Sequence, residues 1–455
     1  MGGERKSANG KSKWEWSLRN LNPISMQARS GPISEYADFV MVSSYSDWRE
    51  LASAYHLKAA QSARVTPRIQ ELADKLTAGL GDSHEQAAVL HRWVLRNIRY
   101  VAVYLGNGGL VPNPAQLVLD NKYGDCKDKV ALLQALLAAK GIESTPVLIG
   151  TQNGPTLAPV PVVGQFDHAI LYLPDQEIYV DPTSERARFG TLPSQDRGRP
   201  VLHTADGRLA RTPAADYASN RSEAVSTYRY DADGNALITQ RFTGGELSEI
   251  DMRNSIAGLG ASARPKVVAA AISEAGLQGV GTLTSSAPPD DLDKPFEVRF
   301  EIQAQSMLNF TRPGSTALQA LVAAESMRDR VRGTPTQANL TPYDCSETDR
   351  KEVYQLDFPW EVSIVQIPED VNFENEAGSY TATWRQEGQR VIASHRLMER
   401  AMQGPEKLCT AGDYVLLRQL YQRIRRSFDE RIHFRPLHDT SAQPARAPSS
   451  GTPPA

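Results

Sequence analysis

The feature that most constrains the fold is a strongly apolar segment with helix signals at both ends. Val130 to Ala139 carries leucines at helical spacing, and Lys140-Gly141 follows it as a stop signal. Asp125 stands at the N-cap position before the segment. A helix that is apolar over so much of its surface has to be buried, and the sequence therefore predicts a domain packed around it.

Cys126 directly follows the predicted cap, in the first turn of this helix. The unpaired backbone N–H groups and the positive end of the helix dipole both favour a thiolate there, so a reactive sulfur is physically plausible. The plainer alternative is a small buried apolar residue. We expect Lys127, Asp128 and Lys129 to be solvated charges or local salt bridges rather than catalysts, although Lys127 could help hold a thiolate.

Two further polar residues follow on predicted strands. After a strand over Ser144 to Gly150, Phe166 to Leu173 alternates as a strand with His168 near its start, and the short strand Ile178 to Val180 ends at Asp181. If these strands pair, His168 and Asp181 lie at neighbouring ends. A thiol nucleophile needs a base, and the base needs a partner that orients it. Cys126, His168 and Asp181 could fill these roles, although a histidine on a strand is more often part of the core.

These segments resemble the transglutaminase-like superfamily of papain-like cysteine enzymes. The resemblance rests on Tyr-Gly-Asp-Cys-Lys-Asp-Lys before the apolar helix, Phe-Asp-His-Ala on the strand and Tyr-Val-Asp-Pro-Thr after it, and it is clear over about residues 80 to 190. More narrowly, the chain is similar to bacterial transglutaminase-like proteins with a β-rich domain on each side of the core. The resemblance implies an α+β fold, in which a papain-like core of helices on an antiparallel sheet precedes a β-rich module with inserted helices.

The resemblance also implies chemistry. Cys126 would be the nucleophile, His168 the base and Asp181 its orienting partner, and an acyl-thioester formed with a glutamine or peptide amide would pass to an amine or to water. No calcium-binding motif is visible, so no cofactor or obligatory metal is expected, in contrast to the animal transglutaminases. Two alternatives stay open: a cysteine peptidase or amidase, and a catalytically inactive binding or scaffold protein of the cell envelope.

An acyl-transfer site also needs hydrogen-bond donors for the oxyanion. The backbone N–H of Cys126 is the natural first donor. Tyr100 and Tyr104 are candidates for the second, although aromatic residues there more often serve packing. Residues 106–114 and Thr151 to Gln165 are the expected walls of the cleft.

At 455 residues the chain is too long for one core. We expect the remnant or divergent end of a leading β-rich domain over 1–45, the catalytic core over 46–195, a β-rich module with helices over 196–438 and a disordered tail over 439–455. Helices are predicted over 46–63, from Pro67 and from Ser83, the last with His91 as a surface or boundary residue. Residues 186–215 are expected to be the exit from the core, and later helices are predicted over 264–275, 316–331 and 413–428.

Composition narrows the partners. Lys and Arg number 50 against 53 Asp and Glu, which gives a net charge of −3 and no reason to expect nucleic acid. No apolar run is long enough to span a membrane. The resemblance implies a protein or peptide substrate as the partner, and the oligomeric state is open.

The compartment is predicted only from the resemblance. The first 30 residues hold no signal-peptide core, but relatives of this architecture are commonly exported, which favours a periplasmic or otherwise exported full-length protein over a cytoplasmic one. Cys345 and Cys409 could form a disulfide in such a compartment, and two buried free thiols explain them equally well.

Overall fold

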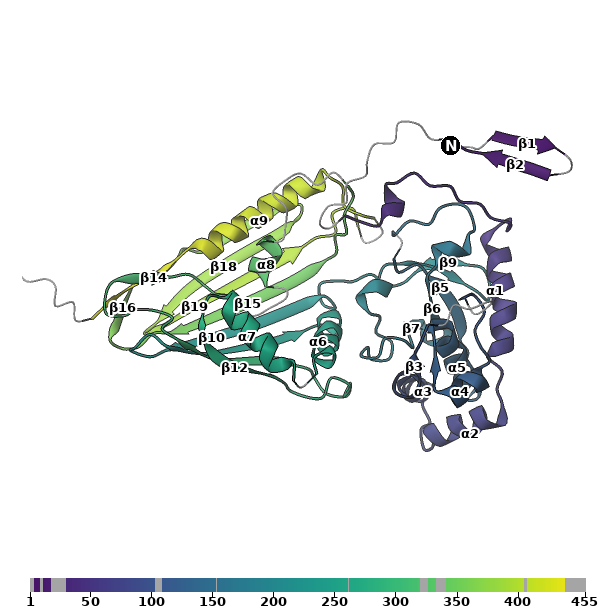
Figure 1. Ribbon diagram of the computed structural model, residues 1–455, viewed down its shortest axis with the longest axis horizontal. Helices are drawn as coiled ribbons and strands as arrows, with labels where there is room; N and C mark the ends of the chain where they lie inside the picture. Colours follow the sequence, from purple (N-terminus) through teal and green to yellow (C-terminus); the bar gives the residue numbers. More distant parts are fainter. Residues whose placement is uncertain are drawn as a thin grey trace, which may run out of the picture.

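The computed structural model describes residues 4–8, 11–17, 30–102, 109–152, 154–260, 262–319, 326–332, 341–404 and 407–437. Figure 1 shows two main bodies, a helix-and-sheet core and an elongated β-rich module, which confirms the predicted α+β class. The predicted tail over 439–455 lies outside the described residues. The domain boundaries stay predictions.

Five helices build one layer of the core. Their bounds are α1 (Trp48–Ser62), α2 (Pro67–Leu76), α3 (Ser83–Asn97), α4 (Ala115–Asn121) and α5 (Cys126–Ala138). Side-chain caps start α2 and α3 as predicted: Thr66 accepts from the N–H of Ile69, and Asp82 accepts from that of Glu85. Helix α5 is buried along most of its length and contacts the other four helices, so it is the centre of the core as expected.

A five-stranded antiparallel sheet forms the second layer. Its order is β7-β6-β5-β8-β9, with β5 (Thr145–Ile149), β6 (His168–Leu173), β7 (Ile178–Val180), β8 (Pro200–His203) and β9 (Leu209–Arg211). A separate parallel pair joins β3 (Arg99–Tyr100) to β4 (Tyr123–Gly124). The expectation that residues 186–215 simply leave the core is wrong, because β8 and β9 complete this sheet. Both strands are short and are flanked by Arg, Gly and Pro residues, so the sequence shows no clear strand pattern there.

The module is built on an eight-stranded sheet of order β12-β13-β11-β10-β15-β19-β18-β17, with β10 and β15 parallel. Helix α9 lies along β17 and β18, and α7 packs on β12 (Figure 1). The strand bounds are β10 (Arg221–Tyr230), β11 (Ala236–Gly244), β12 (Gln278–Ser285), β13 (Val298–Gln305), β15 (Thr348–Asp357), β17 (Val371–Asn375), β18 (Gly378–Glu387) and β19 (Arg390–Glu399). A three-stranded sheet joins β14 (Gly314–Thr316), β20 (Ile432–Pro436) and β16 (Val362–Gln366).

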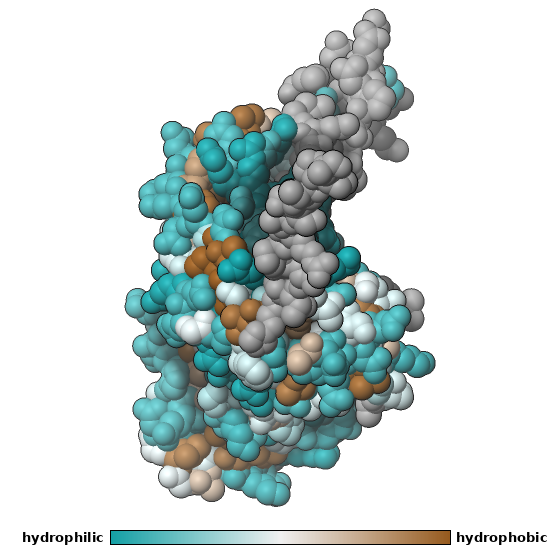
Figure 2. All heavy atoms as spheres, turned by 90° about the vertical axis from the view of Figure 1, so that its left-hand side faces the viewer, coloured by the Kyte–Doolittle hydropathy of each residue, from teal (hydrophilic) through white to brown (hydrophobic). Residues whose placement is uncertain are grey.

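Helices of the module match the predictions in part. Helices α7 (Arg264–Glu274) and α9 (Asp413–Asp429) lie where the sequence predicts them, and α6 (Glu246–Gly258) was missed. The predicted helix over 316–331 is wrong at its start, since Thr316 ends strand β14. Residues 320–325 lie outside the described residues. The end of the predicted segment is helical, as part of α8 (Met327–Arg332). Figure 2 shows the molecule from the end at which the module lies in Figure 1. The described surface on this face is mostly hydrophilic, with hydrophobic residues in small separate groups.

Three features complete the architecture. Near the N-terminus, β1 (Glu4–Ala8) and β2 (Lys11–Glu15) pair as an antiparallel hairpin. Cys345 and Cys409 form a disulfide within the module, whereas Cys126 is free. Across the described parts of the chain, no helix combines the length and the apolar character needed to cross a membrane.

Candidate functional site

Cys126 is the first residue of α5, and a reciprocal capping box holds the helix end beneath it. The Asp125 side chain accepts from the N–H of Asp128, and the Asp128 side chain accepts from that of Asp125. Asn113 donates two more hydrogen bonds to Asp128, from its backbone N–H at 2.7 Å and from Nδ2 at 3.1 Å. Lys127 pairs with Asp125. The cysteine therefore stands on a rigid helix start.

The charged residues after the cysteine are not solvated, contrary to one expectation. Lys127, Asp128 and Lys129 are all buried, and only the expected local ion pair, between Lys127 and Asp125, is present. Gly124 explains part of the burial, because a Cβ there would lie 2.6 Å from that of Asp128. The tight approach of this strand to the helix brings the polar first turn inside the core.

His168 and Asp181 meet as the strand pairing predicts. His168 opens β6 opposite Ile149 of β5, and Asp181 directly follows β7, the strand on the other side of β6. The distance from His168 Nε2 to Asp181 Oδ2 is 3.3 Å. Thr183 holds the Asp181 carboxylate in place, since its N–H and Oγ1 donate to Asp181 Oδ1 at 2.8 and 2.7 Å.

The electrostatics join the cysteine to this pair. Burial alone would lower the pKa of His168, but the Asp181 charge and hydrogen bonds to both Asp181 and Cys126 raise that pKa well above its usual range. Burial would raise the pKa of Asp181, yet His168 and Thr183 lower it to about 2. The structure thus brings Cys126, His168 and Asp181 together, with an ionised carboxylate 3.3 Å from the imidazole.

Two buried basic residues, His91 and Lys129, also lie near Asp181. Neither of them was predicted from the sequence to belong to the site. The expectation that His91 is a surface or boundary residue is wrong: it is 2% exposed, and its Nε2 lies 3.3 Å from the Asp181 carbonyl oxygen. Burial lowers the pKa of His91 to about 4, so the ring is neutral. Lys129 is fully buried, and its Nζ has no hydrogen-bond acceptor among the described residues.

Asp196 is a third missed residue. It closes a single 3₁₀ turn, Ser194–Asp196, beyond the predicted end of the core, and is 0% exposed. One side-chain donor atom from each of His168, Asp181 and Asp196 lies within 4.8 Å of the others. In the described part of the chain, only this group could hold a metal ion by residue type and distance. No local pattern around Asp196 marked it out.

Candidate residues for the cleft fare differently. Tyr100 is 41% exposed on β3, and Tyr104 lies outside the described residues. Tyr55 of α1 packs against the core beside the helix start, where burial and the nearby charges of Cys126, Asp125 and Asp128 raise its pKa. The expected wall at Thr151 is tied to the strand carrying His168, since its N–H and Oγ1 donate to Asp167.

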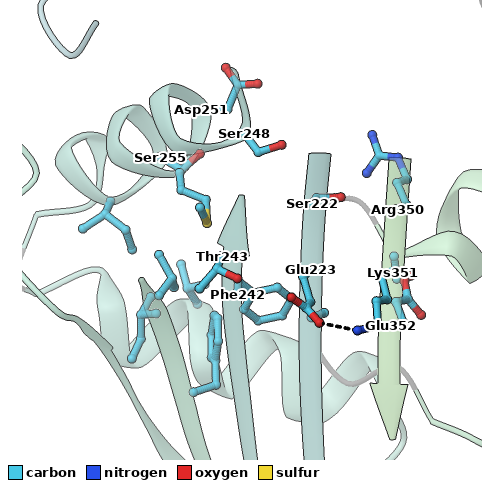
Figure 3. A pocket seen from close by; sticks show the side chains of 18 of the residues that line it. Ser222, Glu223, Phe242, Thr243, Ser248, Asp251, Ser255, Arg350, Lys351 and Glu352 are labelled. Carbon is cyan, nitrogen blue, oxygen red and sulfur yellow. Dashed lines mark hydrogen bonds and ion pairs between the residues drawn. The ribbon is translucent and has the colours of Figure 1, made fainter. Parts of the chain in front are cut away.

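A cavity lies elsewhere, in the module. It has a volume of about 370 Å³ and is lined by α6, by β10, β11, β12 and β13, and by neighbouring residues (Figure 3). Apolar side chains such as Phe242 and Met252 form much of the lining. Glu223 pairs with Lys351 at 2.9 Å beside them (Figure 3). None of Cys126, His168 and Asp181 lines this cavity, so it is separate from the site in the core.

Comparison with known proteins fits the core. Residues 70–169 match the family model of the transglutaminase-like superfamily. This segment of the chain is transglutaminase-like. It holds Cys126 and His168, whereas Asp181 and Asp196 lie beyond the matched residues. The comparison with curated proteins finds no match.

One solved structure resembles this chain over most of its length. It is a protein from Parabacteroides distasonis described provisionally as a protease, with a TM-score of 0.60 at 12% sequence identity. The alignment covers 95% of this chain and 67% of that one. At such low identity the likeness concerns the fold alone, and the fold extends through both the core and the module.

Proposed function

We propose that this protein is a cysteine enzyme of the transglutaminase-like type, with Cys126 as nucleophile, His168 as base and Asp181 as its orienting partner. The observation that carries the proposal is the position of His168, whose Nε2 lies 3.3 Å from Asp181 Oδ2 and whose pKa is raised by Asp181 and by the neighbouring Cys126. A cysteine with an oriented imidazole beside it has the two groups needed for covalent acyl transfer.

The reaction would proceed in two steps. Cys126 Sγ attacks the carbonyl carbon of a glutamine side chain or peptide amide, and the helix-start N–H of Cys126 faces the developing oxyanion. His168 takes the thiol proton and gives it to the leaving nitrogen, which departs as ammonia or an amine and leaves a thioester. An amine or water then attacks the thioester, so the product is a new amide or a carboxylic acid, and the thiol is restored.

The disulfide supports an exported location. Cys345 and Cys409 are bonded in the module, and disulfides persist mainly in oxidising compartments such as the bacterial periplasm. With those two sulfurs paired, Cys126 is the one free thiol of the chain's three cysteines. This pairing favours a periplasmic enzyme that acts on a protein or peptide.

The proposed nucleophile is tested without knowledge of the substrate. We expect iodoacetamide to alkylate Cys126 rapidly at pH 6, far below the range near pH ~8.5 where an ordinary thiol ionises. His168→Ala should abolish this low-pH labelling, and Cys126→Ser is the control for the labelled site. Labelling that rises only near pH 8.5 and ignores His168→Ala would exclude the enzyme and leave a binding protein on this fold.

A second assay separates the two acceptors. Incubation with glutamine-containing peptides and a tagged primary amine should give either tagged peptide, from transfer to the amine, or free acid with release of ammonia or a new N-terminus, from hydrolysis. Cys126→Ser must remove whichever product forms. The absence of both products, despite a His168-dependent thiol, would show that the substrate carries a different acyl group.

A further inference from the structure

The buried carboxyl of Asp196 lies near Asp181, and the ligand atoms of the two residues are within 4.8 Å of each other. The two carboxyl groups differ in the hydrogen-bond donors around them. Asp181 receives two hydrogen bonds from Thr183 and faces the His168 ring. The Asp196 carboxyl oxygens receive no hydrogen bond from any donor in the described part of the chain. An ionised carboxylate buried without donors is very costly, so one proton has to be shared in this pair.

The geometry points to Asp196 as a positioning residue: a neutral carboxylic acid that donates a hydrogen bond to the Asp181 carboxylate and so fixes the group that orients His168. This rests on the proposed function, since Asp181 matters only if His168 acts on Cys126. Burial, followed by the charge of Asp181, raises the pKa of Asp196 to about 8, in line with a protonated acid at neutral pH.

The backbone holds Asp196 in this place. Its N–H donates to the carbonyl of Pro193 at 3.0 Å, and its own carbonyl accepts from Thr212 Oγ1 at 2.5 Å. The next residue, Arg197, donates to Glu246 at the start of α6 at 2.5 Å. The turn is thus tied both to the core sheet and to the module, which fixes the backbone that carries the Asp196 carboxyl, one oxygen of which lies within 4.8 Å of a carboxylate oxygen of Asp181.

The charged groups around Asp196 act in both directions. The charge of His168 of β6 favours an ionised Asp196, whereas burial and the charges of Asp181 and Asp167 favour the acid and prevail. Burial lowers the pKa of Lys129 of α5, against the charges of Glu185 and Asp181. His91 of α3 is neutral. Asp167, which also acts on Asp196, is already satisfied by hydrogen bonds from Thr151 and Gln152.

A metal ion is the competing occupant, because His168, Asp181 and Asp196 carry suitable donor atoms. Burial lowers the pKa of Lys129, which lies near Asp181 without an acceptor among the described residues, so this residue does not decide between the two occupants. Three donor atoms do not complete the coordination of a divalent metal, whereas a proton needs no further ligand. The shared proton is therefore the assignment that the donor set supports.

The direct test is infrared spectroscopy of the full chain at pH 7. We expect the carbonyl band of a protonated carboxylic acid that disappears in Asp196→Asn and persists in Asp206→Asn, a matched change at an exposed aspartate near β9. A spectrum in which Asp196→Asn removes no such band would overturn the proposal. So would a divalent metal that copurifies in stoichiometric amount and is lost from Asp196→Asn.

Labelling of Cys126 tests the positioning role. Asn can donate the same hydrogen bond, so Asp196→Asn should keep the His168-dependent alkylation rate at pH 6 within about threefold, whereas Asp196→Leu should slow it by about tenfold or more. Equal losses in both variants would refute the role. If wild-type labelling ignores His168, the proposed function fails, while the infrared band still decides where the proton lies.

Discussion

A buried acid that keeps its proton makes stability fall as pH rises, and Asp196 offers a measurable case. Its pKa is raised by burial and by Asp181 from 3.8 to about 8, so between these values the folded protein holds a proton that the unfolded chain has released. The favourable contribution is complete below pH 3.8 and is lost progressively as pH rises through about 8. Asn does not titrate, so Asp196→Asn escapes this loss.

The magnitude follows from linkage. Each pH unit in this window is worth about 1.4 kcal/mol, so wild type should lose about 3 kcal/mol relative to Asp196→Asn between pH 5 and pH 7. Urea unfolding of both proteins at pH 5, 6 and 7, followed by fluorescence and circular dichroism, measures the difference. The exposed Asp206→Asn should give a flat difference. A flat line for Asp196→Asn would mean that Asp196 is ionised in the folded protein, which refutes the reasoning.

Two other perturbations probe the supports of the structure. Asp128→Ala removes one acceptor of the capping box and both Asn113 hydrogen bonds, so we expect a loss of about 2–3 kcal/mol in urea unfolding. Asp120→Ala, which removes only exposed contacts with Arg68 and Gln116, should cost less than about 1 kcal/mol. Alkylation without reductant should modify Cys126 alone by mass spectrometry, and reduction of the Cys345–Cys409 bond should destabilise the module by about 2–4 kcal/mol; labelling of all three cysteines would show that the bond is absent.

Where the sequence carries a strong local signal, the predicted elements agree with the structure. Asp82 and Thr66 cap their helices by side-chain hydrogen bonds, and the same residue types mark these positions in the sequence. Helix α6 was missed because its N-cap is Gly245, which makes no side-chain cap. Strand β12 was missed because Gly279 and Gly281 interrupt its pattern, yet a Cβ at Gly279 would lie 2.2 Å from the carbonyl oxygen of Gln303 in β13. The glycines that hide this strand also let it approach its neighbour.

The site shows the same division between local and long-range information. Cys126, His168 and Asp181 could be chosen from sequence because each follows or opens an element with a recognisable pattern, and the roles assigned to them stay predictions. His91, Lys129 and Asp196 carry no such mark, since they reach Asp181 from α3, α5 and the turn at 194–196 only after the core has packed.

Their burial has an electrostatic consequence that residue types alone cannot express. A buried carboxylate such as Asp181 needs a cation nearby. A second carboxyl group buried beside it is favoured in the protonated, neutral form. His168 supplies the cation, His91 stays neutral, and Asp196 is left with no donor in the described part of the chain but its own proton. From the sequence alone, Asp196 would be assigned a negative charge. In the packed core, the protonated and neutral form of this side chain is favoured instead. The same aspartate can therefore stabilise the orientation of His168 at neutral pH and weaken the fold as pH rises.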